Sequence, residues 1–135
     1  MNKQDIINEL NNAKNAHVLW FANAMALSVG TDPGNSSVPK KHTECTFGKW
    51  YYGVGQENNK INAYNAIDNV HKKLHDKYNE IFNEFEKLNS EGFFEDIKLR
   101  NSPEQKKFNE SINELKNISK ELLVILSQVE TEVNK

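Results

Sequence analysis

The chain has 135 residues, with 17 Lys or Arg, 19 Asp or Glu and a net charge of −2. This length suffices for one domain, which we expect to span residues 1–135. The lysines are spread along the sequence, so the chain lacks the basic patch of a protein that binds nucleic acid or an anionic membrane. Its one cysteine, Cys45, excludes an intramolecular disulfide and favours a cytoplasmic location.

The distribution of turn-forming residues predicts an all-α fold. Prolines and glycines are few and clustered, and they leave long segments rich in Asn, Glu, Lys and Leu. The N-terminus lacks the apolar run of a signal peptide, and no segment approaches the length of a membrane span. We therefore expect a soluble helical protein without a membrane partner.

The first long helix is predicted from a stripe of apolar or small residues whose spacing alternates between four and three. The stripe predicts a bundle helix of about six turns that ends near Val29. His17 occupies a core position in it, where an aliphatic residue would pack better. A buried, hydrogen-bonded histidine is the ordinary explanation for one such residue. The members of the stripe are Ile6, Leu10, Ala13, His17, Trp20, Ala24 and Leu27.

The region that follows contains a long loop and then a cysteine among aromatic residues. Residues 30–42 hold two prolines and two glycines, which predicts the loop. Residues 43–53 hold Cys45 and four aromatics, and we expect a short helix or turn that begins at Cys45, with Thr43 or Thr46 as its cap. A helix N-terminus favours the thiolate form of a cysteine.

A second long helix is predicted from about residue 59 to residue 90, and it carries His71 and His75. These two histidines are four residues apart, so they lie on the same face of the helix. Tyr64, His71 and Tyr78 recur every seven residues, as do His75 and Phe82, which places both imidazoles on the inward seam. Alone, such a pair is weak evidence for a metal site, because buried histidines often serve only in packing.

The last part of the chain is predicted to form another long helix. Gly92 should end the preceding helix, while residues 93–101 form either a short helix or a buried connector. Ser102 should cap the final helix, with Pro103 at its first position. This helix has more apolar surface than one neighbour would cover, which suggests a homodimer or an adjoining domain. The surplus residues are Ile118, Leu123, Val124 and Ile125.

Together the inward-facing residues predict a zinc site. One thiolate and three imidazoles, from His17, Cys45, His71 and His75, match the ligands of a four-coordinate zinc ion. A closed shell of this kind marks a structural or sensing site, whereas a catalytic zinc keeps one position for water. His42 is a competing nitrogen, weaker as a ligand because it lies in a loop, although it could serve as an outer or exchange ligand.

Three motifs resemble the bacterial chemoreceptor zinc-binding domain family: His17-Val-Leu-Trp20, Cys45-Thr-Phe-Gly-Lys-Trp50 and His71-Lys-Lys-Leu-His75. The resemblance implies a four-helix bundle, commonly dimeric, with a short extra helix carrying the cysteine. It also places the family's three-histidine, one-cysteine zinc site on the four residues named above. Members typically adjoin chemoreceptors or diguanylate cyclase domains, so the resemblance implies a sensory domain that relays zinc availability or thiol oxidation to a chemotaxis or cyclic-di-GMP signalling partner. Neither a receptor signalling helix nor a cyclase domain is present in this sequence.

Other functions are less well supported by the sequence. An enzyme with an open zinc or iron site would need a catalytic motif such as His-Glu-x-x-His, and none occurs. An oxygen-binding iron bundle normally needs more histidines and inward carboxylates. A helical interaction module without metal, or a protein that stores or buffers zinc, remains open as an alternative. Zinc binding itself should weaken in acid, because the imidazoles must be deprotonated to act as ligands.

Overall fold

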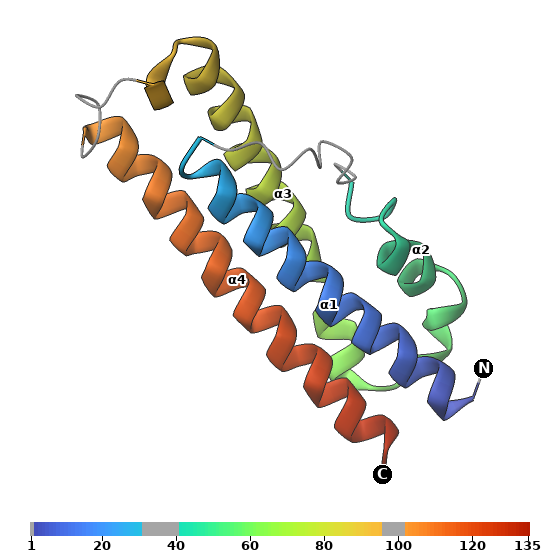
Figure 1. The fold of residues 1–135 in the computed structure, drawn as a ribbon. Coiled ribbons are helices and arrows are strands. Elements are labelled where there is room, and N and C mark those ends of the chain that lie inside the picture. Colours follow the sequence, from blue (N-terminus) through green and yellow to red (C-terminus); the bar gives the residue numbers. More distant parts are fainter. Residues whose placement is uncertain (1, 31–40, 96–101) are drawn as a thin grey trace.

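A computed structural model describes residues 2–30, 41–95 and 102–135. Within these residues the chain forms four α-helices, two short 3-10 helices and no β-strand (Figure 1). The predicted all-α fold is therefore confirmed. In chain order the elements are α1 (Lys3–Leu27), α2 (Thr46–Tyr52), η1 (Val54–Asn58), α3 (Asn62–Ser90), η2 (Phe93–Glu95) and α4 (Pro103–Val133).

The three long helices lie side by side, and the short helix α2 flanks them (Figure 1). Helices α1 and α3 run in the same direction, and α4 runs in the opposite direction and packs along both. Between α1 and α3 the chain must return to its starting end. Helix α2 lies on this return path, so it takes the place of the second helix of a four-helix bundle and carries Cys45 at its start.

Helix α1 begins with a strong local signal and ends two residues before the predicted position. The Asn2 side chain accepts a hydrogen bond from the Asp5 backbone N–H at 2.8 Å, which caps the helix. The helix stops at Leu27 because the chain enters a turn, which Gly30 completes with a φ of 82°. Val29, near which the helix was predicted to end, is 74% exposed.

Helix α3 starts about three residues later than predicted, because a turn at residues 59–61 separates it from η1. The Asn58 side-chain amide donates to the Gly55 carbonyl at 3.0 Å within η1, and α3 begins only at Asn62. Its end agrees with the prediction, since Gly92 follows with a φ of 73°. A short helix does form at Phe93–Glu95, but residues 96–101 of the predicted connector lie outside the described residues.

Helix α4 has the predicted start. The Ser102 hydroxyl accepts a hydrogen bond from the Gln105 backbone N–H at 3.2 Å, and Pro103 is the first helical residue. Val124, one of the surplus apolar residues, is 56% exposed. No helix in the described part of the chain is both long and apolar enough to cross a bilayer. The buried residues of α4 are Phe108, Ile112, Leu115, Ser119, Leu122, Leu126 and Val129.

Candidate metal centre

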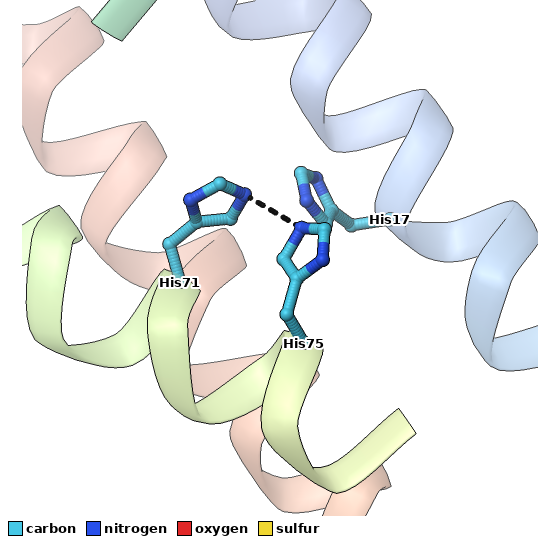
Figure 2. A group of neighbouring side chains, drawn as sticks. All are labelled: His17, His71 and His75. Carbon is cyan, nitrogen blue, oxygen red and sulfur yellow. Dashed lines mark hydrogen bonds between the residues drawn. The ribbon is translucent and has the colours of Figure 1, made fainter. Parts of the chain in front are cut away.

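Three histidines converge in the core between α1 and α3 (Figure 2). His17 comes from α1, and His71 and His75 come from successive turns of α3. One ring nitrogen from each lies within 4.8 Å of the others, and none of the three side chains is more than 1% exposed. The structure thus brings together three of the four residues predicted from the sequence, and their geometry could hold a metal ion.

The spacing of His71 and His75 suits two ligands of one ion. Their Nε2 atoms are 3.1 Å apart, and their rings meet edge to face (Figure 2). In a tetrahedral site with zinc–nitrogen distances of about 2.0–2.1 Å, two nitrogens are separated by about 3.3 Å. The separation that one helical turn imposes on these side chains is therefore close to one edge of the coordination tetrahedron.

His17 presents a ring nitrogen that has no hydrogen-bond partner. Its Nδ1 lies 2.6 Å from the Ala13 carbonyl oxygen, one turn earlier in α1, and because a carbonyl only accepts, Nδ1 must donate. In the neutral ring this leaves Nε2 with a free lone pair, and that atom is buried and unpaired among the described residues. A buried nitrogen without a hydrogen-bond partner lowers the stability of a protein core. In many metal sites, however, an imidazole donates one N–H to a backbone carbonyl and binds the metal through its other nitrogen.

Cys45 joins the cluster through His71. Its Sγ lies 3.4 Å from the His71 Nε2 atom, and the side chain is 4% exposed. A tetrahedral zinc with one sulfur and one nitrogen ligand would hold these atoms about 3.6 Å apart. Cys45 is itself the N-cap of α2, since its Sγ accepts a hydrogen bond from the Gly48 N–H at 3.2 Å. The prediction that Thr43 or Thr46 caps this helix is therefore wrong, because the sulfur fills that role.

Burial shifts the pKa values of Cys45, His17 and His71. It raises the pKa of the Cys45 thiol, and the opposing hydrogen bonds from backbone N–H groups such as that of Gly48 do not compensate. The pKa of the Cys45 thiol is therefore raised, whereas a helix N-terminus was expected to lower it. A metal ion that binds this sulfur has to displace the thiol proton. Burial also lowers the pKa of His17 to about 4 and, together with the neighbouring histidines, that of His71 to about 2. Both imidazoles are therefore neutral near pH 7 and keep a lone pair for a metal.

Aromatic rings enclose the cluster. The Trp20 ring meets the His75 ring edge to face with centroids 4.6 Å apart, and it also contacts the His17 ring at 4.8 Å. Phe47 packs in the same way on His71 at 5.2 Å. These contacts fix the planes of the imidazoles and exclude water. The sequence placed Trp20 on the inward stripe of the first helix, but periodicity within one helix does not show which ring of another helix it meets.

The far end of α2 is fastened to the start of α3 by two tyrosines. The Tyr51 and Tyr64 rings stack with centroids 4.4 Å apart and an interplanar angle of 19°. Each hydroxyl donates to the other residue's carbonyl, at 2.8 Å from Tyr51 and 2.6 Å from Tyr64. This reciprocal pair, which the sequence analysis did not anticipate, holds the C-terminal end of α2 independently of Cys45.

His42 lies beside the cluster but outside the group of three. Its ring centroid is 5.9 Å from that of His71, and its Nε2 is 3.9 Å from a carboxylate oxygen of Asp68. Tyr52 donates a hydrogen bond to the same carboxylate. In this arrangement His42 is an outer neighbour of the three-histidine cluster.

Residues 17–82 match the family described as the chemoreceptor zinc-binding domain. The chain carries a chemoreceptor zinc-binding domain. The matched segment starts at His17 and includes Cys45, His71 and His75, so the resemblance seen in the three sequence motifs is confirmed. Helix α4 and the first half of α1 lie outside the matched segment of the chemoreceptor zinc-binding domain. No individual curated protein and no solved structure matches the chain.

Proposed function

We propose that the chain binds one zinc ion through His17, Cys45, His71 and His75 and acts as a regulatory domain. The observation that carries this proposal is the convergence of three buried imidazoles, one with an unpaired Nε2, beside a buried thiol. Three nitrogens and one sulfur suit the borderline character of zinc. When bound, zinc would supply a closed four-coordinate centre that leaves no position for a substrate water, which favours regulation over catalysis.

The placement of the four residues suggests how loss of one contact changes the fold. His17 belongs to α1, His71 and His75 to α3, and Cys45 to the start of the short helix α2. A helix of seven residues has little stability of its own. Its C-terminal end is held by the tyrosine pair, so the Cys45 end is the part that is free to move when the sulfur leaves.

Oxidation of Cys45 is one way to detach the sulfur. The thiolate would attack one oxygen of a peroxide, and a sulfur–oxygen bond would form as the oxygen–oxygen bond breaks. The sulfur loses two electrons to the peroxide and becomes a sulfenic acid. The second oxygen leaves as hydroxide or alkoxide and takes a proton from solvent. A sulfenic acid is a poorer metal ligand than a thiolate, because it carries less negative charge on sulfur.

Peroxide treatment of the zinc-loaded wild-type chain is expected to raise amide hydrogen exchange in the first turn of α2, residues 46–49, by at least about tenfold. Helices α3 and α4 should keep their protection because their packing is unchanged. The matched control is Cys45→Ser, whose hydroxyl can still cap α2 but cannot form a sulfenic acid. Equal exchange before and after treatment in the wild type, or an equal response of Cys45→Ser, would show that this thiol is not the switch.

We further propose that the domain works in the cytoplasm as a homodimer and relays its state to a chemoreceptor or diguanylate cyclase partner. The family description supports a chemotaxis setting, and the exposed apolar residue Val124 on α4 supports a second protein surface. The competing function is a structural or zinc-buffering module. In that case zinc would bind, but peroxide would not change the amide hydrogen exchange of α2.

A further inference from the structure

A fourth imidazole lies close to the three that form the cluster. His42 precedes Cys45 by three residues, and its ring centroid is 5.9 Å from that of His71 and 6.4 Å from that of His75. The corresponding distances for His17 are 5.2 Å and 6.4 Å. The His42 ring is therefore about as near to the α3 pair as the His17 ring, although it is not one of the three mutually close ligands.

The contacts that hold the His42 side chain in its outer position are weak. Its Nε2 is 3.9 Å from Asp68, a carboxylate that is 55% exposed, and its ring meets the Tyr52 ring at 5.5 Å. A contact of this length between an imidazole and an exposed carboxylate contributes little to stability, because water competes for the carboxylate. Rotation of the side chain away from Asp68 therefore has a low cost.

The backbone of His42, in contrast, is held firmly next to Cys45. The Cys45 Sγ lies 3.5 Å from the His42 carbonyl oxygen. The same oxygen packs so closely on Gly48 that a Cβ atom there would be 1.9 Å from it. The turn thus keeps the His42 side chain within reach of the site from the side on which the Cys45 sulfur lies.

We propose that His42 is a reserve ligand that replaces the Cys45 sulfur on zinc when that sulfur is removed or oxidised. This inference rests on the zinc site proposed above. The site would change from three nitrogens and one sulfur to four nitrogens, so the ion would be retained while the first turn of α2 loses its direct bond to zinc and is linked to it only through His42. The signal would then be a rearrangement around a bound ion, and zinc release would not be required.

The test is a double-mutant cycle in zinc affinity, measured by competition with a chelator of known affinity. Cys45→Ala is expected to weaken zinc binding by about 10–100-fold and still bind one ion per chain. The double variant Cys45→Ala/His42→Ala should lose at least a further factor of about 100, whereas His42→Ala alone should stay within about threefold of wild type. Tyr52→Phe, which removes the hydroxyl bound to Asp68, is the matched control and should have no effect in the Cys45→Ala background.

Cobalt substitution gives a second readout. Cobalt-loaded Cys45→Ala should lose the sulfur charge-transfer band but keep the intense visible bands of tetrahedral geometry. In the double variant these visible bands should shift or weaken, because water replaces the His42 nitrogen as the fourth ligand. The inference is overturned if the double variant binds zinc as well as Cys45→Ala, or if His42→Ala weakens binding by the same factor in both backgrounds. A wild-type chain that binds no zinc would instead refute the proposed function itself, so the two failures are distinguishable.

Discussion

A zinc chelator is expected to lower the midpoint of thermal unfolding of the wild-type chain by about 10 °C or more. An ion present at about 1,000 times its dissociation constant adds about 4 kcal/mol to the free energy of unfolding, and in a domain of this size each kcal/mol changes the midpoint by about 3–4 °C. The effect should be large because the buried nitrogen of His17 has no hydrogen-bond partner among the described residues. Differential scanning calorimetry with and without chelator measures it.

Two variants separate this effect from general destabilisation. His71→Ala removes a central member of the cluster, so its unfolding midpoint should no longer respond to the chelator. Lys14→Ala removes a 2.7 Å ion pair with Glu130 between α1 and α4, and it should keep the full response. A wild-type midpoint that does not change with chelator would support a metal-independent helical module.

Gly48→Ala is expected to weaken zinc binding by about 10–100-fold, as for other changes that misplace a ligand. A Cβ atom at position 48 would lie 1.9 Å from the His42 carbonyl oxygen, so the turn that carries Cys45 would have to move away. The Gly48 N–H that donates to the Cys45 sulfur is retained in the variant, so the effect is steric. Isothermal titration with zinc measures the loss.

The matched control is Gly92→Ala at the end of α3. Gly92 has a φ of 73° and no atom within 4 Å of an added Cβ, so alanine there adds only conformational strain of about 1–2 kcal/mol. That variant should be less stable but should bind zinc with wild-type affinity. If Gly48→Ala also binds zinc normally, the position of the Cys45 turn is not important for the site.

The inward direction of the histidines could be predicted from the sequence because it depends on the period of a single helix. His17 shares a stripe with Leu10 and Leu27, and His71 shares one with Tyr64, so each had to face the core once its helix formed. That these stripes meet at one point depends on how far α1 is shifted along its axis relative to α3. The period of one helix does not determine that shift. The prediction of a shared zinc site therefore relied on the chemistry of the residues and on the family resemblance.

Details that depend on contacts between elements could not be predicted. The Cys45 sulfur caps α2 in place of a threonine and also faces His71, which is distant in sequence. Asn23 is buried on α1 with a side-chain nitrogen that has no partner among the described residues, although asparagine is normally assigned to the surface. The pKa of the Cys45 thiol is raised, not lowered, because neighbouring elements bury it, and the rules for a single helix do not include this burial.

The most direct test of the zinc site is the metal content per chain of the purified protein, measured by elemental analysis. We expect about one zinc per chain in the wild type and in His42→Ala. After purification without added zinc, the content should be reduced in the four single alanine variants of His17, Cys45, His71 and His75, because each binds the ion more weakly. Cys45→Ala should lose the least and should return to one zinc per chain when zinc is added. Absence of metal from wild-type protein prepared with excess zinc would contradict the account and leave a helical bundle with buried histidines.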